Sequence, residues 1–511
     1  MPPTATRSVA KNTFLLTMGL MVGRLFAVFI TKKMTPVLGP EGMGIWFLAN
    51  DITVILLTVA NFGLGTLLTR EITARPDQNW AQLWAALRLR WLLGAGGFAV
   101  LWLYLRAVGE DHLTTLAVMV TAAGLFIETT AMACDSVLQA HEKVQHQSIG
   151  QVVSAVVYFG LAWWWLDLGW GLMGVIWANF ASRVARLAVM APLMLKFTGP
   201  WRRPQPGEQA PDLRWMLRLG WPMFLATTLG IISYKVDTVM LSAMAGKAAT
   251  GIYGLGHRAL DILLILPNIF ATAMFPALAR YSQRSTTDAT RLAERSLRYM
   301  LVVAVPLAWL TVLASRPLIE WFARGTSDAD PAAFAGSILV LQLVIWGLPL
   351  QSANHVLNRA LIAAGREQVF VAIGASALAV NVLLNSVLIP RFGTMGAGAA
   401  TVYTLGQSML LHLWFLRRTD YRVTVVRALA GPPVVLALSW AATAGALRWL
   451  APAWLDGWFQ LDTGAWTPFL GGAALWAVLY LALTLALRVI DRLDLALLPQ
   501  LLGRAAPGSD G

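Results

Sequence analysis

The stretch Phe14–Ile30, FLLTMGLMVGRLFAVFI, sets the interpretation of the whole chain, because it carries one ionisable side chain, Arg24, in an otherwise apolar run. An α-helix of about 20 apolar residues can cross a hydrocarbon layer of about 30 Å. Of the 511 residues, 57% are hydrophobic and 13% are charged, whereas soluble domains carry about 25% charged residues. Similar apolar runs follow at Leu92–Leu105, Leu116–Phe126, Ile149–Leu166 and Trp476–Leu487. The sequence therefore predicts an all-α polytopic membrane protein.

Hydropathy predicts about fourteen membrane spans. They cover residues 12–31, 44–68, 88–106, 113–135, 148–166, 171–195, 216–241, 249–275, 297–321, 334–358, 368–389, 395–416, 424–450 and 467–488. Most of the 39 Lys and Arg residues then fall on the side of the N-terminus, with Arg90, Arg183 and Arg186 counted there as inner-loop residues. Because Lys and Arg concentrate in cytoplasmic loops, both termini are predicted to be cytoplasmic. This bias also explains the net charge of +13 without a nucleic-acid partner.

A short repeat links the two halves of the chain. Gly44–Asn50 (GIWFLAN) resembles Gly251–His257 (GIYGLGH), an offset of 207 residues (251 − 44 = 207). Duplication predicts two six-span lobes related by an axis along the membrane normal, as in transporters whose lobes rock around a central site. The predicted domains are an N-terminal lobe at 1–197, a cytoplasmic linker at 198–213, a C-terminal lobe at 214–418, two additional helices at 419–490 and a cytoplasmic tail at 491–511.

Ionisable side chains inside the predicted spans are the candidate functional residues, because a charge in a span is costly unless it faces a cavity or a partner. The predicted cavity cations, which would bind an anionic substrate, are Arg24, Lys235, Arg258 and His257. Arg and Lys bind phosphate through charge-assisted hydrogen bonds. The carboxylates that would couple transport to an ion, or would only pair internally, are Asp51, Glu128, Asp237 and Asp261. The internal pairs left open are Arg258 with Asp261, Asp51 with Arg24, and Asp237 with Lys235.

No catalytic or nucleotide-binding motif accompanies these charges. The sequence contains neither H-E-x-x-H nor G-x-x-x-x-G-K-[ST], and a single cysteine, Cys134, allows no intramolecular disulfide. We therefore expect a protein that is not an enzyme and that has no metal, cofactor or ATP site. Its work would then be driven by an H⁺ or Na⁺ gradient, by the membrane potential or by the gradient of the substrate itself.

Three segments resemble one family of transporters. They are Lys235-Val-Asp237 followed by Gly251-Ile-Tyr253, the pair Leu266-Pro267 with Phe275-Pro276, and Leu38–Gly44. These segments resemble the polysaccharide transporter family, which includes the Wzx-type O-antigen flippases, within the multidrug/oligosaccharidyl-lipid/polysaccharide exporter superfamily. The resemblance implies two six-helix lobes in a V, two extra C-terminal helices and a place in the bacterial inner membrane.

The resemblance also implies a substrate. Members of the family move undecaprenyl-diphosphate-linked oligosaccharides from the inner to the outer leaflet for surface polysaccharide synthesis. Arg24 stands in a place similar to the first-span arginine of the lipid II flippases, although the charged cluster that follows it in those relatives is missing here. The implied partners are the lipid-linked glycan, membrane lipids, and a glycan polymerase or glycosyltransferases.

Two other functions stay open at this point. One is a multidrug or cation antiporter of the same superfamily, although cationic drugs favour acidic cavities and this cavity is predicted to be basic. The other is a membrane glycan polymerase or acyltransferase, although such enzymes need a large outer loop and the longest predicted here is about 451–466.

Overall fold

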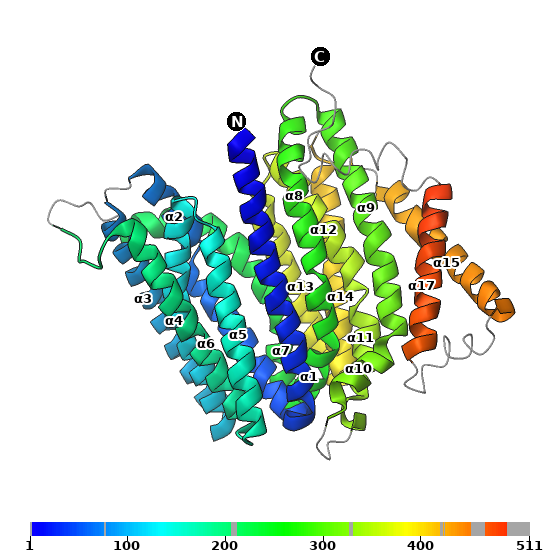
Figure 1. Ribbon diagram of the computed structural model, residues 1–511, viewed down its shortest axis with the longest axis horizontal. Coiled ribbons are helices and arrows are strands. Elements are labelled where there is room, and N and C mark those ends of the chain that lie inside the picture. Colours follow the sequence, from blue (N-terminus) through cyan, green and yellow to red (C-terminus); the bar gives the residue numbers. More distant parts are fainter. Residues whose placement is uncertain are drawn as a thin grey trace. The chain divides into compact units, whose positions relative to one another are not determined.

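The computed structural model describes residues 3–75, 78–205, 212–325, 331–419, 423, 425–450 and 466–487. Within these ranges the regular elements are all helices (Figure 1). In chain order they are α1 (Pro3–Asn61), α2 (Leu64–Ala74), α3 (Asn79–Val108), α4 (His112–Ala140), α5 (Gln145–Asp167), α6 (Gly171–Thr198), α7 (Leu213–Leu263), α8 (Ile265–Ser282), α9 (Thr286–Leu313), α10 (Ser315–Ala323), the short 3₁₀ helix η2 (Pro331–Phe334), α11 (Gly336–Val344), α12 (Gly347–Ala363), α13 (Val369–Phe392), α14 (Thr394–Leu416), α15 (Val425–Leu450) and α17 (Trp466–Ala486).

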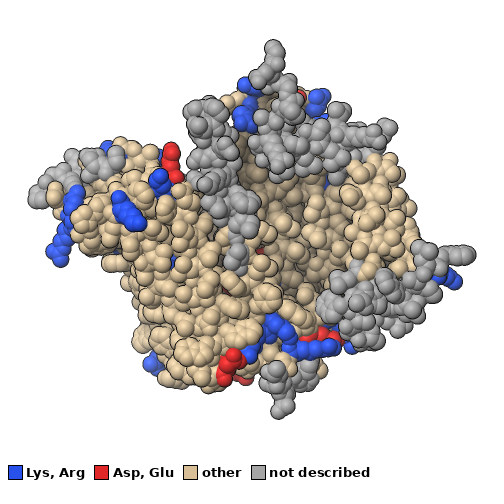
Figure 2. All heavy atoms as spheres, in the orientation of Figure 1, with Lys and Arg blue, Asp and Glu red and all other residues tan. Residues whose placement is uncertain are grey.

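The described helices confirm the prediction of a multi-pass membrane protein. Eight candidate spans are long and apolar enough to cross a membrane, or nine if the pair Ala332–Val344 and Gly347–Ala363, bent by 41°, counts as one. Two of them, Gly23–Ala74 and Thr227–Ser282, are 52 and 56 residues long, enough for two crossings each at about 20 residues per crossing. The predicted number of about fourteen spans stays a prediction. On the face drawn in Figure 2, charged side chains gather mainly toward the helix ends and the surface between them is largely uncharged.

One glycine divides each of the two longest helices. Gly39 in α1 has φ 63° and ψ −179°, and Gly246 in α7 has φ 86° and ψ 174°. A positive φ of this kind strongly favours glycine, which lacks a Cβ. The two positions are 207 residues apart (246 − 39 = 207), which is the offset of the sequence repeat. We call the parts of α1 and α7 before and after these glycines the first and second arms of each helix.

The arms meet at a backbone crossing between Gly44 and Gly251. A Cβ on Gly44 would overlap the carbonyl of Lys247, and a Cβ on Gly251 would overlap the carbonyl of Pro40. Because Lys247 corresponds to Pro40 at the same offset (247 − 40 = 207), the contact is reciprocal between the two sequence repeats. This close approach explains why both repeats place glycine at the first position of the GI motif.

Packing divides the chain into two compact units, which are described separately. The first contains Met1–Gly254 and Phe322–Ala333, and the second contains Leu255–Trp321 and Phe334–Gly511. In the first unit α5 packs on α1 and α6, and α4 packs on α1 and α6. In the second unit α12 packs on α9 and α14, and α15 packs on α9 and α17. The predicted domain boundaries stay a prediction, and the predicted tail at 491–511 lies outside the described residues.

Candidate functional site

Lys235 and Asp51 form an ion pair within the first unit. Nζ of Lys235, in the first arm of α7, lies 2.8 Å from Oδ1 of Asp51, in the second arm of α1. The Thr238 hydroxyl donates a hydrogen bond to Oδ2 of Asp51 at 2.7 Å. The Lys235 ammonium also lies 5.2 Å from the centre of the Tyr234 ring, within cation–π range. The side chains are 19% and 14% exposed for Lys235 and Asp51, so this pair is neither fully buried nor fully hydrated.

These contacts decide some of the ion pairs that the sequence leaves open. Asp51 is paired with Lys235 and not with Arg24. Asp237 is buried and accepts a hydrogen bond from the Tyr253 hydroxyl at 3.1 Å, which joins the first and second arms of α7. Tyr253 belongs to the GIY segment, so one of the segments that carries the family resemblance also positions a buried carboxylate.

Arg24 lies in the first arm of α1 and its side chain is exposed. Among the described residues no carboxylate forms an ion pair with it. An arginine in an apolar helix that has no protein anion beside it can bind an anionic ligand. This is the environment that the predicted cavity role requires, and the role itself stays a prediction.

Arg258, His257 and Asp261 lie in the part of α7 that belongs to the second unit. Nδ1 of buried His257 is 3.5 Å from Oδ1 of Asp261, one helical turn further on. The sequence leaves a pair between Arg258 and Asp261 open, and the contact described for Asp261 is with the His257 ring. Arg258 is half-buried, and its Nε is buried without a hydrogen-bond partner. The predicted cations are therefore divided between the two units.

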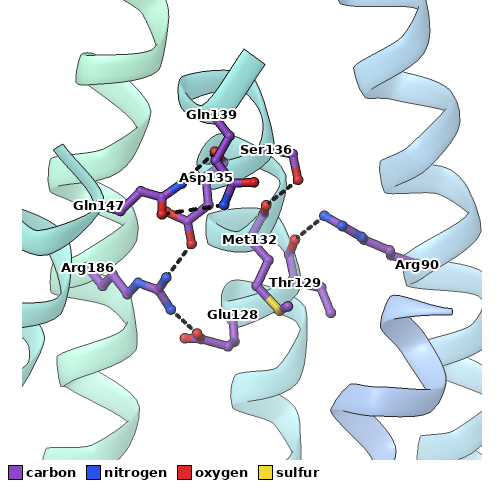
Figure 3. Close-up of polar contacts among 9 residues, drawn as sticks. All are labelled: Arg90, Glu128, Thr129, Met132, Asp135, Ser136, Gln139, Gln147 and Arg186. Carbon is purple, nitrogen blue, oxygen red and sulfur yellow. Dashed lines mark hydrogen bonds and ion pairs between the residues drawn. The ribbon is translucent and has the colours of Figure 1, made fainter. Parts of the chain in front are cut away.

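The prediction that Arg90, Arg183 and Arg186 lie in inner loops is wrong. Arg90 lies inside α3 and is fully buried, and Arg186 lies inside α6 with its side chain 7% exposed. Figure 3 shows that the Arg186 guanidinium pairs with both Glu128 and Asp135 of α4. The positive-inside bias misassigned these arginines because it counts residues near span ends and cannot detect a buried partner.

Arg90 extends the same cluster to two more helices. Its guanidinium donates to the Thr129 carbonyl of α4 at 3.1 Å and to Oδ1 of Asn61, at the end of α1, at 2.9 Å. The spacing of Glu128 and Asp135 in the sequence indicates that they could share a partner, because residues seven positions apart lie on one face of a helix. Glu128, a predicted ion-coupling residue, is thus an ion-pair partner that holds α4 to α6. Its predicted coupling role stays a prediction.

Lys247 forms further ion pairs in the first unit. Its Nζ lies 2.6 Å from Glu110 and 2.7 Å from Asp111, at the junction of α3 and α4. Asp111 also caps α4 by accepting a hydrogen bond from the Thr114 amide at 3.0 Å. Partial burial acts to raise the pKa of the Asp111 carboxyl, but the hydrogen bonds from Lys247 and Thr114 outweigh it and hold this pKa well below its ordinary value. These contacts connect the α7 glycine kink to the loop before α4.

An apolar cavity of about 310 Å³ lies within the second unit. It is lined by Leu301, Val305, Trp346, Pro349, Leu350, Met409, Pro432 and Pro433, which come from α9, the start of α12, α14 and α15. Pro432 and Pro433 lie inside α15, where proline removes a backbone donor and can bend the helix. A cavity with such a lining suits a hydrocarbon better than a sugar.

Residues 9–282, more than half of the chain, match the protein family described as Polysaccharide biosynthesis protein, and residues 222–387 match the family MatE. Two similar proteins come from Haloferax volcanii. The chain is 26% identical over 224 residues to the "Probable flippase AglR". The match covers 43% of this chain and 44% of AglR, so the aligned part spans less than half the length of that relative. It is 20% identical over 380 residues to the "Probable low-salt glycan biosynthesis flippase Agl15", over 74% of this chain and 77% of Agl15.

A solved structure shares the fold. The structure of lipid II flippase MurJ in an inward closed conformation matches with a TM-score of 0.73 at 14% sequence identity. The match covers 92% of this chain and 98% of that chain. At this level of identity the likeness shows the fold alone.

Proposed function

We propose, because the chain belongs to the polysaccharide biosynthesis protein family, that it is a flippase for a lipid-linked oligosaccharide. It would carry an undecaprenyl-diphosphate-linked glycan from the inner to the outer leaflet of the bacterial inner membrane by alternating access. Both termini would be cytoplasmic, and a glycan polymerase or glycosyltransferases would act before or after it. The names of AglR and Agl15 support the proposal, since both relatives are described as probable flippases.

The observation that carries the proposal is the environment of Arg24. An exposed guanidinium in an apolar helix needs an anion, and no described carboxylate supplies one. A diphosphate fits this need because arginine binds phosphate oxygens with two parallel hydrogen bonds. Lys235, also in the first unit, is the further cation that we assign to this head group. The apolar cavity described in the second unit suits a hydrocarbon chain. The transfer would be driven by an H⁺ or Na⁺ gradient acting through Asp51, Glu128, Asp237 or Asp261, by the membrane potential, or by the gradient of the substrate itself.

Replacing Arg24 by Ala should reduce glycan export at least about tenfold. A hydrogen bond to a charged group contributes about 1.5–3 kcal/mol, and about 1.4 kcal/mol corresponds to a factor of ten. The measurement is the amount of surface glycan in a strain that carries the variant as its only copy, normalised to the amount of protein in the membrane. Arg24→Lys should retain part of the export, because it keeps the charge but loses the bidentate geometry.

Arg106→Ala is the matched control, because it also removes one exposed arginine from a membrane helix. This control should leave export unchanged. Normal export by Arg24→Ala at normal protein level would refute the role of Arg24 in binding the substrate.

A multidrug antiporter is the second candidate, and the match of residues 222–387 to the MatE family favours it. Deletion of the protein separates the two functions. A flippase leaves lipid-linked glycan on the inner leaflet when it is lost, and drug susceptibility is unchanged. An antiporter leaves the glycan unaffected and makes cells more susceptible to cationic drugs, whereas a polymerase leaves unjoined lipid-linked units on the outer leaflet.

A further inference from the structure

The Lys235–Asp51 ion pair joins segments from the two sequence repeats. Asp51 follows the first GI motif, on the second arm of α1, and Lys235 precedes the second GI motif, on the first arm of α7. Beyond this pair, the two helices meet at the Gly44–Gly251 crossing, where the ring of Phe47 also packs against Gly254. The ion pair, with the Thr238 hydrogen bond to the same carboxylate, is therefore the polar side-chain part of a contact that also includes backbone and apolar atoms.

Two features make this ion pair suited to exchange. The Asp51 carboxylate has a second donor, the Thr238 hydroxyl, and so keeps a hydrogen bond when the ammonium leaves. The ammonium is a compact charge with three donors on a flexible stem, so it can turn from one anion to another.

The Arg186 cluster provides the contrast. Arg186 is 7% exposed, and its guanidinium already pairs with two carboxylates of the protein. Lys235 is 19% exposed and pairs with Asp51. Of these two clusters in the first unit, the Lys235 pair therefore has the cation that is more accessible to a ligand.

We propose that Asp51 is a displaceable counter-ion of Lys235, and that a phosphate-bearing ligand takes its place on the ammonium. The proposal rests on the proposed function, since it assigns a diphosphate as the incoming anion. Asp51 then acts as an internal competitor that lowers the apparent affinity by the fraction of Lys235 that it occupies. Because the ion pair joins α1 to α7, ligand binding also removes the charged part of the contact between these helices.

Binding of farnesyl diphosphate to the purified full-length protein in nanodiscs tests this exchange by calorimetry. Asp51→Asn should bind this probe about tenfold more tightly than the wild type, because the amide keeps the shape but no longer competes as an anion. Lys235→Met should weaken binding at least about tenfold. Asp51→Glu keeps the competing charge and should bind like the wild type. Inorganic pyrophosphate and farnesol, measured in parallel, show whether a free diphosphate or the lipid is recognised.

Lys247→Gln is the matched control, because it removes a different lysine ion pair from the same unit. It should not change the affinity. Asp51→Ser serves as a second charge-removing variant if Asn impairs folding, and thermal unfolding checks each protein. Unchanged or weaker binding by the folded Asp51 variants, with a wild type that does bind, overturns the exchange and leaves the flippase proposal intact. A folded wild type that binds neither farnesyl diphosphate nor pyrophosphate overturns both.

Discussion

Replacing Arg186 by Met is expected to destabilise the protein by about 3–5 kcal/mol, because it leaves Glu128 and Asp135 buried without their cation. The two carboxylates are 17% and 16% exposed, so water can restore only part of the lost interaction. The loss affects the packing of α4 on α6, inside the first unit. It should appear as a lower thermal unfolding temperature of the detergent-purified protein and as less protein in the membrane.

A triple variant separates charge from packing. Arg186→Met combined with Glu128→Gln and Asp135→Asn removes both unpaired charges, and it should recover much of the lost stability. Arg284→Met removes an exposed arginine and should have little effect. If Arg186→Met unfolds at the same temperature as the wild type, the cluster does not stabilise this unit.

Replacing Gly251 by Ala is expected to produce the second large effect. The added Cβ would overlap the Pro40 carbonyl, and relief requires movement of backbone because no flexible side chain can turn away. Overpacking of a tight contact costs about 1–3 kcal/mol or more. Gly44→Ala should behave alike, because its Cβ would overlap the Lys247 carbonyl. Thermal unfolding and the export assay both measure the result.

Gly230→Ala is the matched control in the same helix. Its Cβ would meet no atom within 4 Å, and Ala is favoured over Gly in a helix by about 0.8–1.0 kcal/mol. This variant should therefore be as stable as the wild type or slightly more stable. Gly251→Ala and Gly230→Ala proteins with equal unfolding temperatures would contradict a close backbone crossing at Gly251.

The sequence predicts the helices of this fold from hydropathy, and it predicts the corresponding positions of their breaks from the repeat. Apolar runs such as Phe14–Ile30 predict membrane helices because hydropathy depends on each segment's own residues. The repeat at Gly44 and Gly251 predicts corresponding positions in two copies, and the glycine kinks occur at the same offset. Gly39 and Gly246 break α1 and α7 between the expected spans 12–31 and 44–68 and between the expected spans 216–241 and 249–275.

The candidate site shows where sequence reasoning ends. Lys235 and Asp51 were both identified as unusual because an ionisable residue in an apolar segment is visible without a structure. Their pairing was not predicted, since the two residues are 184 positions apart (235 − 51 = 184). Arg186 was assigned to the wrong environment for the same reason, because its carboxylate partners lie on another helix.

The sequence by itself determined that this chain is helical and embedded in a membrane, that a short motif recurs 207 residues further on, and that a few charges stand inside its apolar segments. Those properties follow from composition and from spacing along one helix. Only the tertiary structure decided that Lys235 pairs with Asp51, that Arg186 pairs with Glu128 and Asp135, and that Gly44 crosses Gly251. The physical reason is that an isolated charge can pair with any opposite charge in reach, and the packing of helices distant in sequence determines which one is in reach.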